Sequence, residues 1–176
     1  ERLPIPIIDS YSLRSFTSNP YMANHLAELW HKDKTSSHQR FLATAWQFAD
    51  EAIPIGRIKE SWSIVQEAIS TSRERVAQGD LDAESELVLL LERAAWLADI
   101  QDKPAVSEVY AKEFYDWNVK VWQRNKAHIG LIEPTAEAIC NYGYALLKNN
   151  KISEVKSQIK SGLPIASLLY GFTSDR

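Results

Sequence analysis

Four side chains of metal-ligand type in the stretch "HLAELWHKD" form the part of the sequence best suited to metal chemistry: His25, Glu28, His31 and Asp33. Glu28-x-x-His31 is half of the pattern by which paired helices hold a carboxylate-bridged di-iron centre. The other half is missing, because the chain has no second Glu-x-x-His. His25 and His31 would also point about 120° apart on a helix of 3.6 residues per turn. Two ordinary surface histidines are therefore expected, with a metal site or enzyme centre on His25, Glu28 and His31 as an alternative.

The rest of the sequence lacks the short motifs that carry catalysis. It has no phosphate-binding glycine loop, no His-Glu-x-x-His zinc helix, no paired Cys-x-x-Cys and no EF-hand loop. The single cysteine, Cys140 in "EAICNYGYALL", has mostly apolar or neutral neighbours and is predicted to be a buried core thiol. The sequence thus predicts a protein that is not an enzyme, with no catalytic residue and no cofactor.

Cysteine content and apolar runs bear on the compartment. One cysteine cannot form an internal disulfide, so nothing in the sequence calls for an oxidising environment. The longest apolar run covers residues 87–91, far short of the roughly 20 residues that cross a membrane. A cytoplasmic protein without membrane contact is expected.

Helical periodicity dominates from residue 19 onward. Asn19 followed by Pro20 is typical of a helix N-cap and first helical position. Apolar residues then recur three and four apart, which predicts an all-α fold of seven or eight antiparallel helices in one domain over residues 19–176. The predicted helices cover about 20–34, 37–52, 58–79, 82–101, 104–125, 134–148 and 151–161, the last stopped by Gly162, with a short terminal helix after 164.

The first 18 residues are predicted to form an extended arm. Pro4 and Pro6 disfavour a helix, whereas the leucine and isoleucines around them are too apolar to remain in water. The arm is expected to lie along a groove on its own domain or on a second copy, which would make a homodimer.

A short string occurs twice, as Val106-Ser107-Glu108-Val109 and as Ile152-Ser153-Glu154-Val155, 46 residues apart. Aromatic landmarks at Trp46, Trp96 and Tyr142 suggest three hairpins at about 38–79, 81–126 and 133–162. The third, with Tyr142, Gly143 and Leu146 before its turn and Val155 and Ile159 after it, resembles a tetratricopeptide-like repeat. The resemblance implies a solenoid of stacked hairpins with a surface for partner binding. An irregular helical bundle is the alternative.

Charge and aromatic residues place the predicted binding surface in the C-terminal half. Residues 1–119 hold 12 basic and 19 acidic side chains, whereas residues 120–176 hold 8 and 4. In the helix predicted at 104–125, Tyr110, Phe114 and Trp117 are assigned to the core. The predicted partner-binding residues are Tyr115, Trp122, Lys112, Lys120, Arg124, Lys156 and Lys160.

Such a basic and aromatic strip suits an acidic or phosphorylated peptide of a partner protein. The sequence therefore favours a non-enzymatic protein-interaction module: an adaptor, an assembly factor or a regulatory subunit. RNA or single-stranded nucleic acid is the alternative ligand of the same strip. The sequence pI of about 5.8 weighs against it.

Overall fold

The computed structural model describes residues 19–33, 40–124, 129–160, 162 and 164, and all regular structure in these ranges is helical. The predicted all-α fold is confirmed. The elements are α1 (Pro20–Asp33), α2 (Arg40–Ala52), α3 (Ile58–Ala77), α4 (Leu81–Ile100), α5 (Pro104–Arg124), the 3₁₀ helix η1 (Ile129–Leu131), α6 (Ile132–Lys148) and a helix at residues 152–160. The predicted arm at 1–18 and most of the predicted terminal helix lie outside the described residues.

Side chains and prolines fix the helix starts. Asn19 Oδ1 accepts a hydrogen bond from the Tyr21 amide at 2.9 Å, which confirms the predicted N-cap of α1. Asp80, which the sequence reading missed, caps α4 by accepting from the amides of Asp82 and Ala83 at 3.0 and 3.1 Å. Pro104 opens α5, as predicted.

Gly162 does not end the last helix, contrary to the prediction, because Gly162 and Pro164 both have helical backbone. A Cβ at residue 162 would lie 2.7 Å from Cγ2 of Ile139 on α6. Glycine is therefore required here for close helix packing rather than for a turn.

Four connections use one turn geometry. A residue with positive φ follows the helix, and the next amide donates to the carbonyl five residues earlier, as Lys103 does to Ala98 at 2.9 Å. This is the Schellman arrangement, which satisfies carbonyls at a helix end. The positive-φ residues are Gly56, Gly79, Asp102 and Asn150, with φ of 83°, 89°, 55° and 58°.

The helices pair into three hairpins: α2 with α3, α4 with α5, and α6 with the helix at 152–160. Their turn residues, Gly56, Asp102 and Asn150, set the register of the repeat. Positions eight before, four before and five after each turn residue are buried. In chain order these positions hold Phe48, Ala52 and Ser61; Ala94, Ala98 and Ser107; and Tyr142, Leu146 and Val155. The repeat is therefore 46 residues from the first turn to the second, and 48 from the second to the third.

The predicted 46-residue offset between the last two hairpins was wrong by two residues. It would pair Val109, which is exposed, with Val155, which is buried. The two Ser-Glu-Val strings differ in position, because Val106 is the third residue of α5 whereas Ile152 is the first residue of its helix. The aromatic landmarks are not equivalent either: Trp46, Trp96 and Tyr142 lie ten, six and eight residues before their turns.

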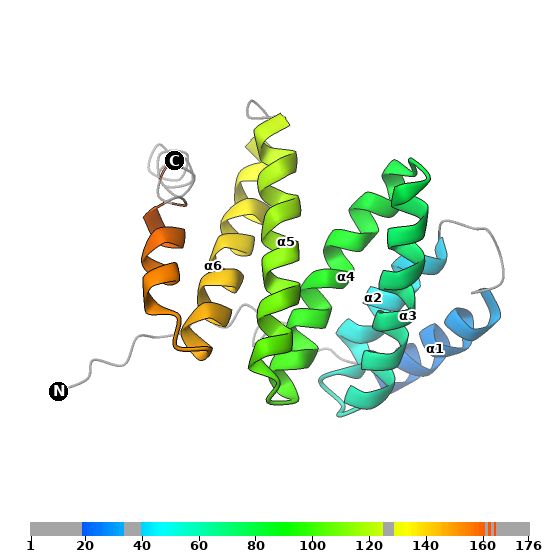
Figure 1. Cartoon of the computed structure of the whole chain (residues 1–176). Helices are drawn as coiled ribbons and strands as arrows, with labels where there is room; N and C mark the ends of the chain where they lie inside the picture. The colour runs from blue at the N-terminus through cyan, green and yellow to red at the C-terminus, as the bar shows by residue number, and fades with distance from the viewer. Residues whose placement is uncertain (1–18, 34–39, 125–128, 161, 163, 165–176) are drawn as a thin grey trace, which may run out of the picture.

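The three hairpins lie side by side in two layers (Figure 1). One layer holds α2, α4 and α6; the other holds α3, α5 and the helix at 152–160. In the second layer, Tyr110 Oη donates to Gln66 Oε1 at 2.7 Å, and the rings of Tyr110 and Trp62 meet edge to face at 6.1 Å. The helix α4 is central, as predicted, since it packs against α2, α3 and α5. At the N-terminal end, α1 packs on α2.

No helix in the described ranges combines the length and the apolar character that a membrane crossing requires.

Candidate functional site

The predicted basic strip on α5 carries both signs of charge. Lys112 Nζ lies 2.5 Å from Asp116 Oδ2, and this hydrogen bond raises the pKa of Lys112. Arg124 approaches Glu84 of α4 at 4.0 Å. Because exposed pairs of this kind cancel much of each other's field, the strip attracts anions less than its lysines suggest.

The two aromatic residues predicted to contact a partner, Trp122 and Tyr115, instead pack against other residues of this chain. Trp122 is only 8% exposed and packs with Ile132, so it lies in the core, contrary to the prediction that it faces a partner. The reason is that η1 and the start of α6 fold back against the end of α5. Tyr115 is half-buried and stacks on Tyr142 of α6, with ring centroids 5.5 Å apart.

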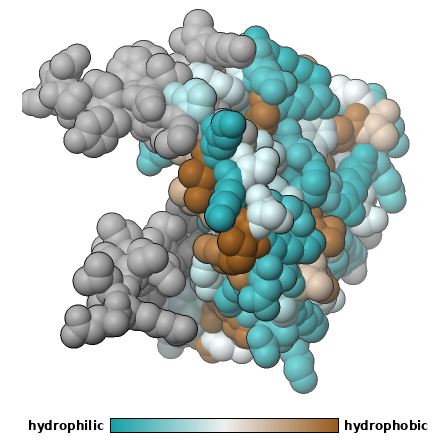
Figure 2. Space-filling view, turned by 60° about the vertical axis from the view of Figure 1, so that its left-hand side comes forward, coloured by the Kyte–Doolittle hydropathy of each residue, from teal (hydrophilic) through white to brown (hydrophobic). Residues whose placement is uncertain are grey.

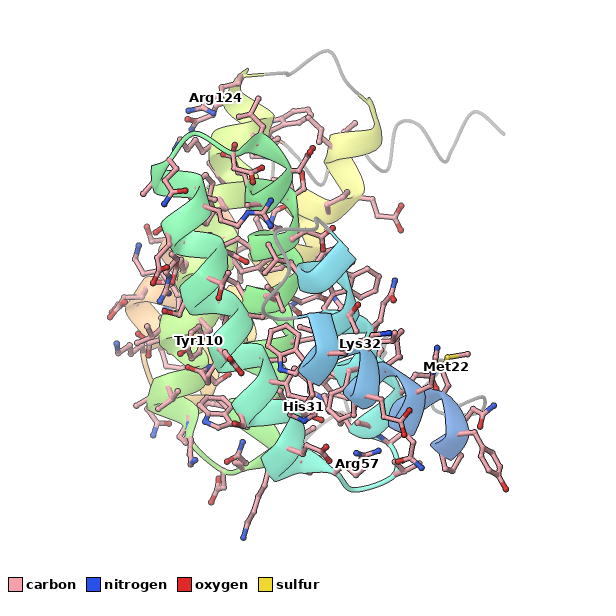
Figure 3. All side chains as sticks on the ribbon, turned by 90° about the vertical axis from the view of Figure 1, so that its right-hand side faces the viewer. Met22, His31, Lys32, Arg57, Tyr110 and Arg124 are labelled. Carbon is pink, nitrogen blue, oxygen red and sulfur yellow. The ribbon has the colours of Figure 1, made fainter. Side chains whose placement is uncertain are left out.

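The remaining predicted residues come from two elements. Lys120 places its ammonium 4.4 Å from the centre of the Trp117 ring. Arg124 lies at the end of α5 away from the Arg57 turn (Figure 3). Lys156 and Lys160 are exposed on a different element, the helix at 152–160.

The candidate metal ligands His25, Glu28 and His31 are all exposed on α1, and Figure 3 shows the position of His31. Among the described residues, no three His, Cys, Asp or Glu side chains come together as metal ligands would. The side chain of Asp33 lies outside the described part of the structure.

Cys140 lies exposed on α6, contrary to the predicted core position. Partial desolvation raises the pKa of its thiol, and the charge of Glu137 raises it further. Both effects disfavour the thiolate, which is the nucleophilic form. The arrangement is therefore the opposite of an activated cysteine.

A more consistent surface appears when the contacts between hairpins are compared. The second hairpin contacts the third hairpin through residues at five positions relative to its turn residue, Asp102: Ala95, Asp99, Pro104, Glu108 and Ala111. Ala95 and Ala111 share a cluster with Tyr142 and Val155. Asp99 pairs with Lys148, the Pro104 carbonyl accepts from Asn149 Nδ2 at 2.9 Å, and Glu108 Oε1 lies 2.5 Å from Lys151 Nζ.

The equivalent positions of the third hairpin form what we call the C-terminal edge: Gly143, Ile159, Leu147, Ile152 and Lys156. Ala111 is 1% exposed beneath the third hairpin, whereas its counterpart Ile159 is 54% exposed. Leu147 and Ile152 are 49% and 50% exposed. Figure 2 turns this end of the molecule forward and shows apolar surface among hydrophilic surface. Grouped apolar exposure of this kind is typical of a contact site.

The sequence reading identified only part of this edge. It selected Lys156 for its charge, but it did not select Leu147, Ile152 or Ile159. The signal that would have found them is the turn register, which requires knowing that Asp102 and Asn150 adopt positive φ. No family model, curated protein or solved structure matches the chain, so the site is inferred from the hairpins themselves.

Proposed function

We propose that this chain is a non-enzymatic protein-interaction module that binds a helical segment of another protein at the C-terminal edge. The supporting observation is that Leu147, Ile152 and Ile159 are half-exposed at positions that are covered or paired one hairpin earlier. Burying an apolar side chain fully is worth about 1.5–3 kcal/mol, so covering these half-exposed ones would contribute roughly 1 kcal/mol each. Stacked hairpins are also suited to extension, because each one contacts only its neighbours.

Lys156 and Lys160 favour an acidic partner, since both lie on the helix that carries Ile152 and Ile159. The absence of catalytic motifs and the raised pKa of Cys140 support a role without catalysis. The RNA-binding alternative loses part of its basis, because Lys112 and Arg124 lie beside carboxylates. The cytoplasmic location stays a prediction.

The test compares affinity capture from the native source by three full-length baits: wild type, the double variant I152D/I159D, and V109D. Val109 is a matched control because it is 62% exposed and apolar but lies on α5, away from the edge. A partner should be retained by wild type and V109D and lost from I152D/I159D, with all three baits equally folded by circular dichroism. Identical sets of bound proteins on all three baits would contradict the proposal.

A further inference from the structure

We infer that the partner presents a helical hairpin that continues the stack, with an acidic residue directly after its turn. This inference deepens the proposed function and rests on it. It comes from the contacts by which each hairpin of this chain docks on the one before it.

In the second and third hairpins, the residue directly after the hairpin turn contacts a residue of the preceding hairpin. That residue lies six positions past the turn of the preceding hairpin. Lys103 follows the second turn, and its ammonium lies 5.2 Å from the ring centre of Trp62, six residues past Gly56. Lys151 follows the third turn and pairs with Glu108, six residues past Asp102. In both cases a cation meets a group that attracts cations.

At the C-terminal edge this receiving position holds Lys156. A docking hairpin with a basic residue after its turn would bring two positive charges together. An Asp or Glu there would instead form an ion pair with Lys156. At the edge the receiving residue is therefore basic, whereas inside the stack it is Trp62 or Glu108, each of which attracts a cation.

Two further contacts specify the rest of the docking turn. Lys148, two residues before its turn, meets Asp99, whereas the position equivalent to Asp99 on the edge is the apolar Leu147. Asn149 donates to the carbonyl of Pro104, and the equivalent carbonyl is that of Ile152. The expected docking turn thus reads apolar residue, Asn or Gln, a residue with positive φ, then Asp or Glu.

The same reasoning disfavours a second copy of this chain as the occupant. The three hairpin turns of the described structure are followed by Arg57, Lys103 and Lys151, all basic. Each would meet Lys156 with like charge, which is a recognised way of excluding wrong partners. A different, acidic protein fits the edge better.

The test uses two synthetic hairpin probes made from residues 132–160 of this chain. Both carry K148L, so that an apolar residue faces Leu147, and one also carries K151E. Each probe is labelled and titrated with the full-length chain at low salt, with fluorescence anisotropy as the readout. Because the pair is exposed, exchanging repulsion for attraction should tighten binding of the K151E probe by about fivefold. The K156E chain should reverse this preference.

The outcomes separate the two proposals. If both probes bind equally and I152D/I159D abolishes binding, the edge is a docking site but the acidic inference is wrong. If neither probe binds although circular dichroism shows both to be helical, or if binding survives I152D/I159D, the proposed function fails as well.

Two other results would also overturn the inference. One is self-association of the chain in sedimentation equilibrium that I159D removes, which would make a second copy the occupant. The other is probe binding that strengthens tenfold or more after removal of residues 165–176, which would make this chain the occupant of its own edge.

Discussion

The contact between α2 and α4 contains a buried arginine whose removal should destabilise the whole stack. The side chain of Arg93 is 4% exposed, forms a two-bond pair with Asp50 at 2.9 and 2.9 Å, and also pairs with Glu92. Its guanidinium lies 5.5 Å from the ring centre of Trp46, whose Nε1 donates to Glu86. The Arg93 guanidinium thus contacts Asp50 and the Trp46 ring of the first hairpin as well as Glu92 of the second, and so links the two hairpins.

R93M keeps side-chain bulk but leaves Glu92 buried without this cation. Removing one partner of a buried ion pair typically costs about 3–5 kcal/mol, because the remaining charge stays out of water. For a chain of this size, 1 kcal/mol lowers Tm by about 2–4 °C, so a drop of roughly 10 °C is expected. R124M is the matched control: Arg124 is exposed and only 4.0 Å from Glu84, so a change within about 0.5 kcal/mol is expected.

The assay is urea unfolding of the full chain, followed by both circular dichroism and tryptophan fluorescence. Coincident transitions would justify a two-state free energy. A loss below about 1 kcal/mol for R93M, or an equal loss for R124M, would refute the reasoning that this buried charge joins the two hairpins.

Three smaller predictions follow from local geometry. G162A should lower the free energy of unfolding by about 1–2 kcal/mol, because its methyl group would meet Ile139, whereas G143A, with nothing within 4 Å, should raise it slightly in the same urea assay. D80N should lower Tm at neutral pH. The Ala83 amide and Arg75 hold the pKa of Asp80 below 3.8, so its charge stabilises the fold above that pH, and the difference from wild type should vanish as pH falls through the lowered pKa. Cys140 should react with a thiol reagent in the folded protein, at a rate that still rises above pH 9.0, because its pKa is raised; no reaction without denaturant would contradict its exposure.

The helices could be predicted from sequence because local chemistry defines them. Asn19 and Pro20 mark the start of α1, Gly56 and Gly79 end α2 and α3 with positive φ, and Pro104 begins α5. These signals act within one turn of the chain and need no tertiary context. The apolar side of each helix follows from the same periodicity, as the burial of Val65 and Ile69 confirms.

The register between hairpins could not be predicted, because it depends on two residues that do not resemble turn glycines. Asp102 and Asn150 adopt positive φ in the structure, and Asn and Asp tolerate this region more easily than most residues. Without them, similar strings at Val106 and Ile152 gave an alignment that was two residues out. The same shift hid the C-terminal edge, which is visible only when equivalent positions are compared.

The exposure of single residues also could not be predicted from the sequence. Trp122 and Cys140 were assigned to the surface and the core respectively, and the structure exchanges them. Each assignment depends on where α6 packs against α5, and the helical periodicity of either segment does not specify that packing. Charge pairing is equally nonlocal for Arg124, whose carboxylate neighbour Glu84 comes from α4.

Amide hydrogen exchange of the full-length chain, with and without the K148L/K151E hairpin probe, tests the central claim most directly. Docking at the C-terminal edge predicts slower exchange confined to residues 143–160 when the probe is added. Slower exchange confined to α1, α2 and α3, with residues 143–160 unchanged, would contradict it.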